Sequence, residues 1–119
     1  MSRYLYSVVR CLPHPWTGEF VNVGVIAGSD DGDWTVKPID LSPRARDFVG
    51  AAALGVAAEF LQRLQVECET SRPGEAWLVR LYEEHRNTIQ LSPPMPVLAD
   101  GPEAAAGVIL DDLAVPADR

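Results

Sequence analysis

Two runs of residues typical of buried β-strands, joined by a short connection that contains prolines, constrain the fold of this chain most. The first run covers residues 4–11 and the second covers residues 20–27. The connection has two prolines one residue apart, which cannot continue a hydrogen-bonded ladder. A turn rich in Gly, Asp and Ser at residues 28–33 precedes a third strand-like run at residues 34–39. This order predicts an antiparallel meander.

The middle of the chain carries the periodicity of amphipathic helices. Ser42 followed by Pro43 signals a helix start, because serine caps the first turn and proline is tolerated at the first helical position. Apolar residues at spacings of three and four keep one stripe in phase over residues 45–64. A glycine inside a helix costs about 1 kcal/mol relative to alanine. Gly50 and Gly55 therefore predict a short helix and then a longer one, with the break near Gly50.

The remaining sequence completes the predicted order of elements. A further helix begins after the Pro73-Gly74 pair, a short strand covers residues 88–91, and a final helix covers residues 102–113. We expect an α+β fold, an antiparallel β-meander of three to four strands with helices packed on one face, in the order βββααβα. At 119 residues, the chain is predicted to form a single domain over residues 1–119.

The alternation of side chains along a strand indicates which residues lie under the helices. In the second strand, Val21, Val23 and Val25 alternate with Asn22 and Gly24. We expect the three valines to face the helices, because small β-branched residues pack well on a half-buried sheet surface. The opposite face of the sheet then carries polar and small residues.

This opposite face and its rim form the candidate functional face. If the first two strands pair as a hairpin, Arg10 and Asn22 share a face, because directly paired residues always do. Tyr6 is expected to lie across the notch that Gly24 leaves, and Glu19 to reach the rim from the loop. Arg10 and Glu19 form either a structural ion pair that closes the hairpin or a catalytic pair. We favour the ion pair, because arginine stays charged and cannot act as a base.

The distribution of charge argues against one class of function. The formal net charge is −7, and residues 1–46 contain five basic and five acidic residues, so the whole excess of negative charge lies in residues 47–119. Such an acidic half repels a phosphate backbone, and neither half has the stripe of Lys and Arg that nonspecific nucleic-acid binding requires. We therefore expect no direct binding to nucleic acid.

Membrane, metal and redox functions have no support in the sequence either. No apolar run approaches the roughly 20 residues needed to span a bilayer, and no signal-peptide pattern precedes the first strand. Cys11 and Cys68 have neither CxxC nor Cys/His spacing, so we expect two buried, unpaired thiols. The sequence predicts a cytoplasmic protein with no membrane anchor, no metal and no cofactor.

The first part of the chain carries a family resemblance. Its elements are Tyr6-Ser7-Val8-Val9-Arg10, then Pro13 and Pro15, then Gly18-Glu19-Phe20-Val21-Asn22-Val23-Gly24-Val25. This string resembles the N-terminal signature of the bacterial domain of unknown function family 3037. Residues 88–92, with the prolines after them, and a final helix containing Leu110 and Leu113 are similar to later parts of the family pattern. The resemblance implies a bacterial protein of a family without an established activity. It also implies a HipA-like kinase as protein partner, because members often sit beside a gene for such a kinase.

Two classes of function remain open. The first is a small interaction or accessory module that binds another protein through the face with Arg10 and Asn22, or through the acidic C-terminal half. The second is an enzyme, a hydrolase or a nucleic-acid-processing enzyme, with Glu19 as general base or metal ligand and Arg10 and Asn22 as electrostatic stabilisers. We favour the module, because a single carboxylate rarely suffices for a metal site. A concave pocket around the three residues would favour the enzyme.

Overall fold

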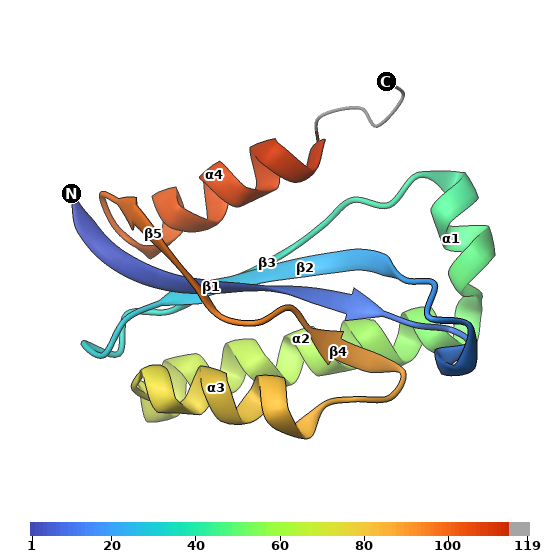
Figure 1. Cartoon of the computed structure of the whole chain (residues 1–119), viewed down its shortest axis with the longest axis horizontal. Helices are drawn as coiled ribbons and strands as arrows, with labels where there is room; N and C mark the ends of the chain where they lie inside the picture. Colours follow the sequence, from blue (N-terminus) through green and yellow to red (C-terminus); the bar gives the residue numbers. More distant parts are fainter. Residues whose placement is uncertain (115–119) are drawn as a thin grey trace.

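A five-stranded antiparallel sheet with helices on both faces forms the framework of the chain, in a computed structural model that describes residues 1–114 (Figure 1). The strands are β1 (Ser2–Cys11), β2 (Val21–Gly28), β3 (Thr35–Pro38), β4 (Ile89–Leu91) and β5 (Met95–Ala99). β2 lies between β3 and β1, so the predicted antiparallel meander is confirmed. β4 and β5 both pair with the other edge of β1.

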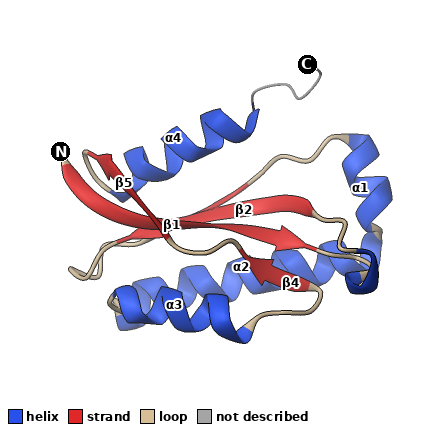
Figure 2. Ribbon diagram, viewed as in Figure 1, coloured by secondary structure: helices blue, strands red, loops and turns tan. Residues whose placement is uncertain are grey.

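The helices begin and end close to where the sequence predicts. They are α1 (Pro43–Val49), α2 (Ala51–Ser71), α3 (Glu75–Glu84) and α4 (Pro102–Ala114), with a short 3₁₀ turn over Pro15–Thr17 (Figure 2). The Ser42 hydroxyl accepts a hydrogen bond from the Ala45 N–H at 3.1 Å, so the predicted cap is confirmed. Gly50 separates α1 from α2 with a φ of 86°, a conformation that favours glycine. The predicted break near Gly50 is therefore confirmed.

The predicted order of elements is incomplete, because the observed order of strands and α-helices is βββαααββα. The additional strand is β5, which contains Pro96 and follows two further prolines, so its sequence does not predict a strand. A proline argues against a central strand because it cannot donate to the ladder. β5 pairs only with β1, at an edge of the sheet, where a proline is tolerated.

The prediction that the helices pack on one face is wrong. In Figure 1, α2 and α3 lie on one side of the sheet and α4 lies on the other. The sheet thus separates two cores. The α2/α3 core includes Leu5, Val9, Cys11, Val23, Ile26, Phe60, Leu64, Trp77, Leu78 and Leu81. The α4 core includes Tyr4, Val8, Val25, Ala27, Ala99, Ala105, Ala106 and Ile109.

A β-bulge in β2 moves part of the strand to the unexpected face. Val9 pairs with Gly24 and Arg10 pairs with Asn22, so Val23 is an extra residue on the β2 side. As a result, Val23 packs in the α2/α3 core as predicted, whereas Val25 packs under α4 on the opposite face. The prediction that Val25 shares a face with Val23 is therefore wrong, because strict alternation does not continue through a bulge.

Ser92 fills the gap that β4 and β5 leave along β1. β4 pairs with residues 9–11 of β1, and β5 pairs with residues 2–6. Between these segments, the Val8 N–H donates to Ser92 Oγ at 2.7 Å, and the Ser92 N–H donates to the Val8 carbonyl at 2.9 Å. Both residues are buried, so Ser92 satisfies two main-chain groups that water cannot reach.

Within residues 1–114, no helix combines the length and the hydropathy that a bilayer crossing requires.

Candidate functional site

A row of three polar residues crosses the end of the sheet. Arg10 pairs with Asn22 of β2 on one side and with Gln90 of β4 on the other. The prediction that Arg10 and Asn22 share a face is confirmed by this pairing. The neighbours of Arg10 along β1, Val9 and Cys11, belong to the α2/α3 core, so the row lies on the opposite face of the sheet.

The side chain of Arg10 stacks on an aromatic ring and has no ion-pair partner among residues 1–114. Its guanidinium carbon lies 4.5 Å from the centre of the Phe20 ring, which is a cation–π contact. The ion pairs in this part of the chain join the N-terminus to Asp100, Arg3 to Glu75, and Lys37 to Glu103. The predicted ion pair between Arg10 and Glu19 is therefore wrong. Phe20, the residue directly before β2, takes the place that was assigned to Glu19, because its ring and not the Glu19 carboxylate lies against the guanidinium.

Two buried polar atoms in this row have no hydrogen-bond partner. They are Nε of Arg10 and Oδ1 of Asn22. A buried polar group without a partner typically costs about 1–3 kcal/mol, so such a pair is unusual in a folded protein. Arg10 is only half-buried, so part of its side chain remains accessible for contacts.

Gly24 does not belong to the candidate face, whereas Tyr6 lies on that face four residues before Arg10 in β1. The side of Gly24 where a Cβ would stand points at α2, since that atom would lie 2.8 Å from Leu61 Cδ2. The expected notch with Tyr6 lying across it is therefore wrong, because the bulge turns Gly24 to the α2 face. Tyr6 pairs with Ala27 and packs against the α4 core. Gly24 instead allows α2 to approach β2 closely.

Glu19 lines an open depression beside α1. The depression has a volume of about 560 Å³ and includes Phe20, Arg44 and Phe48 in its lining. Neither Arg10 nor Asn22 lines it. The structure thus brings Arg10 and Asn22 together in the sheet and places Glu19 in a separate depression. A catalytic arrangement of Glu19 with Arg10 and Asn22 around one cavity is not present in the described part of the chain.

Exposed aromatic side chains gather at this end of the molecule, where Figure 1 shows the β1–β2 connection beside α1. Trp16 is 82% exposed, Phe20 is 45% exposed and Phe48 is 41% exposed. Arg44 of α1 is also exposed, and none of the ion pairs within residues 1–114 involves it. We call this region the hairpin-end surface, which comprises Arg10, Trp16, Glu19, Phe20, Asn22, Arg44 and Phe48.

Several residues of this region were not predicted from the sequence. Phe20 is two residues before Asn22, so the alternation that predicts the face of Asn22 predicts the same face for Phe20. Gln90 stands between two apolar residues of a short strand, which is the pattern of a side chain on the opposite face. Arg44 and Phe48 are four residues apart on a helix, and this spacing places them on one side of α1.

The residues that commonly carry chemistry are not clustered. No group of three or more His, Cys, Asp or Glu side chains within residues 1–114 is placed to hold a metal ion. Cys11 and Cys68 are buried and unpaired, as predicted. Burial, together with the nearby Glu67 and Glu69 carboxylates, raises the pKa of the Cys68 thiol to about 12. Because the thiolate is the reactive form, Cys68 is unreactive at neutral pH.

The comparisons with known proteins agree with the resemblance in the N-terminal signature. The model of the family described as Protein of unknown function (DUF3037) matches residues 6–114. The match includes every residue of the hairpin-end surface and all of α4. No curated protein and no solved structure matches the chain.

Proposed function

The chain belongs to the DUF3037 family, and we propose that it is a cytoplasmic bacterial interaction module that binds a protein partner, a HipA-like kinase, through the hairpin-end surface. One observation carries the proposal. Arg10 is a partly buried charge with an unpartnered Nε atom, and it is held against the exposed ring of Phe20. Arginine and aromatic side chains dominate the binding energy of protein interfaces.

The chemistry of this surface indicates what a partner must present. Arg10 and Arg44 have no ion-pair partner within residues 1–114, and Glu19 is the only carboxylate that lines the depression beside α1. A partner segment with a carboxylate beside an apolar side chain fits this pattern. The carboxylate would accept charge-assisted hydrogen bonds from Arg10, and the apolar group would pack on Phe20 and Phe48.

The enzyme alternative gains no support from this arrangement. A general base must lie within hydrogen-bond reach of the proton that it removes, beside the groups that stabilise the developing charge. Glu19 lines the open depression, while Arg10 and Asn22 lie outside it. An open surface with aromatic and arginine side chains suits protein binding better than it suits catalysis.

Binding of the purified HipA-like kinase from the same genome to variants of the surface tests the proposal. We expect Arg10→Ala and Phe48→Ala each to weaken the affinity about 10-fold or more, because truncated hot-spot residues cost about 2 kcal/mol. Glu19→Gln should also weaken binding, because the Glu19 carboxylate would pair with a basic group that the partner presents at the rim. Calorimetry with each variant measures these affinities.

Thermal melts and matched variants separate binding from folding. We expect Arg10→Ala to lower the melting temperature, because it removes the contact with Phe20, and Glu19→Gln to leave it almost unchanged. Arg44→Ala tests the same surface at a residue that belongs to α1 and not to the sheet. Arg80→Ala on α3 and Val66→Ala on α2 are exposed controls outside the surface and should bind normally. Normal affinity in all the surface variants would exclude this surface and leave the acidic residues 47–119 as the candidate.

A further inference from the structure

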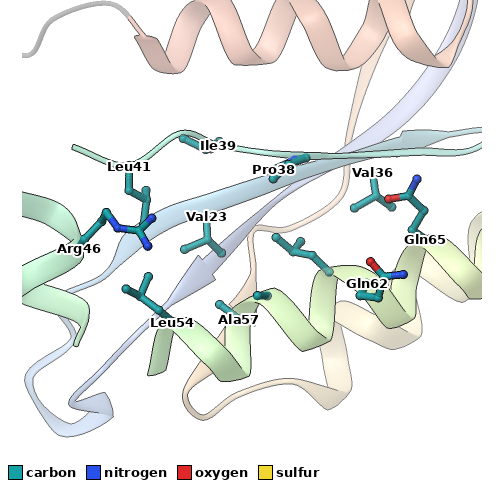
Figure 3. Close-up of a pocket in the computed structure, with 12 residues that line it drawn as sticks. Val23, Val36, Pro38, Ile39, Leu41, Arg46, Leu54, Ala57, Gln62 and Gln65 are labelled. Atoms are coloured by element: carbon teal, nitrogen blue, oxygen red, sulfur yellow. The ribbon is translucent and has the colours of Figure 1, made fainter. Parts of the chain in front are cut away.

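A second concave site lies between the sheet and α2, on the face opposite to the Arg10 row. It is a cavity of about 290 Å³, lined by β2, β3, the segment after β3, α1 and α2 (Figure 3). Its walls are mainly apolar side chains, among them Val23, Leu41, Leu54 and Leu61. Neither Arg10 nor Glu19 lines it, so this site is separate from the hairpin-end surface.

The β-bulge helps to shape this cavity. The bulge directs the Val23 side chain toward α2, where it forms part of the cavity wall, and it turns the position of a Gly24 Cβ toward α2 as well. Leu61 of α2 packs into the space that Gly24 leaves. β3 is the edge strand of the sheet, so no further strand closes the cavity on that side. Ile39 and Leu41, in the segment after β3, line the cavity instead.

One charged side chain faces this apolar space. Figure 3 shows the guanidinium of Arg46 extending from α1 between Leu41 and Leu54, toward Val23. Arg46 is the only charged residue in the cavity lining, which includes no carboxylate. None of the ion pairs within residues 1–114 involves Arg46. The other polar side chains of the lining are the amides of Gln62 and Gln65 on α2.

An apolar cavity with one convergent cation is the pattern of a site for a small amphipathic anion. We propose that this cavity binds a carboxylate with a short hydrocarbon chain, with the carboxylate on Arg46 and the chain along Val23 and Leu61. The volume suits a ligand of this size, because a cavity of about 150 Å³ accommodates benzene. A cationic or purely apolar ligand would leave Arg46 without an anionic partner.

Calorimetric titration with octanoate tests the charge requirement directly. Octanol and octylamine serve as probes with the same chain and a neutral or cationic head group. We expect octanoate to bind with a Kd of roughly 10 μM to 1 mM, a range that its number of atoms allows. Octanol should bind at least fivefold more weakly, and octylamine should not bind measurably. Equal binding of the three compounds, or no saturation by octanoate at millimolar concentration, would overturn the proposal.

Two variants and one matched control locate the site. Arg46→Gln should weaken octanoate binding at least fivefold and leave octanol binding unchanged. Ala58→Leu adds bulk to the cavity wall at an exposed position of α2 and should weaken binding of both compounds. Arg80→Gln removes an exposed charge on α3, outside the cavity and outside the hairpin-end surface, and should bind octanoate normally. Octanoate binding that is unchanged in Arg46→Gln would contradict the assignment of the anion to Arg46.

Discussion

Two buried serines differ in their hydrogen bonding: Ser7 belongs to β1, and Ser92 lies beside the same strand at Val8. Ser7 is completely buried, and its Oγ atom has no hydrogen-bond partner. Ser92 is also buried, but its Oγ atom accepts a hydrogen bond from the Val8 N–H at 2.7 Å. The cost of burying a hydroxyl is offset only where the hydroxyl forms a hydrogen bond. Ser7 is therefore a local departure from an optimally stable core.

We expect Ser7→Ala to leave the free energy of unfolding unchanged or to raise it by up to about 1 kcal/mol. The substitution removes an unpartnered polar atom and keeps the small size that the packed interior requires. Denaturation in urea, followed by fluorescence of the tryptophans, measures the difference. A loss of stability above about 1 kcal/mol would show that the hydroxyl has a partner, such as an ordered water.

Ser92→Ala is the matched control for this measurement. It makes the same chemical change at a hydroxyl that is used, so it leaves the Val8 N–H buried without its acceptor. We expect a loss of about 1–3 kcal/mol, the usual cost of an unsatisfied buried donor. The opposite signs of the two effects would distinguish the role of each hydroxyl from the general effect of a Ser→Ala change.

At the scale of elements, the sequence predicts which helices and strands form better than it predicts on which face of the sheet a residue or helix lies. The helix start at Ser42, the break at Gly50 and the meander follow from local chemistry, so they could be read from neighbouring residues. The bulge at Val23 could not, because it depends on the pairing of β2 with β1. The position of α4 on the other face follows from that long-range packing as well. A single inserted residue thus separated Val25 from Val23 and Gly24 from the candidate face.

The N-terminal turn of α4 is attached to the edge of the sheet by Glu103. Its carboxylate lies 2.7 Å from the Lys37 ammonium and accepts a hydrogen bond from the Thr35 hydroxyl at 2.9 Å. The Lys37 hydrogen bond, followed by that of Thr35, lowers the pKa of Glu103 below its usual value. A carboxyl whose pKa is lower in the folded state stabilises that state above its unfolded pKa and loses this contribution as the pH falls.

We therefore expect the free energy of unfolding to fall on acidification, and we expect this fall to be smaller in Glu103→Gln. The contribution of Glu103 is complete above the pKa of an unfolded glutamate, about 4.3, and disappears as the pH falls through the lower pKa of the folded state. Because the side chain is largely exposed, solvent screening limits the effect to less than about 1 kcal/mol. Urea denaturation of both proteins at a series of pH values measures it. Glu59→Gln, at an exposed position of α2, is the control, and an equal change in its pH profile would contradict the role of Glu103.

For the molecule as a whole, only the part of the candidate site that depends on strand pairing was predicted from the sequence. Arg10 and Asn22 were placed together correctly because cross-strand pairing fixes their common face. Glu19 and Gly24 were separated from them by the loop and the bulge, which obey no simple periodicity. The cavity with Arg46 was not predicted, because it forms between segments distant in sequence. Patterns within one element are visible in the sequence, whereas sites between elements depend on their packing.

The overall charge leads to the last prediction, that the protein does not bind duplex DNA nonspecifically at physiological salt. Nonspecific affinity comes from basic side chains that displace counterions from the phosphates. The formal net charge here is −7, and all of this excess lies in residues 47–119. The ion pairs of Arg3 and Lys37 further reduce the free positive charge at the sheet. Fluorescence anisotropy with a labelled duplex should show no saturation at micromolar protein, with a basic DNA-binding domain as positive control. Low-micromolar affinity that falls steeply with added salt would contradict this prediction, because that dependence is the signature of phosphate contacts.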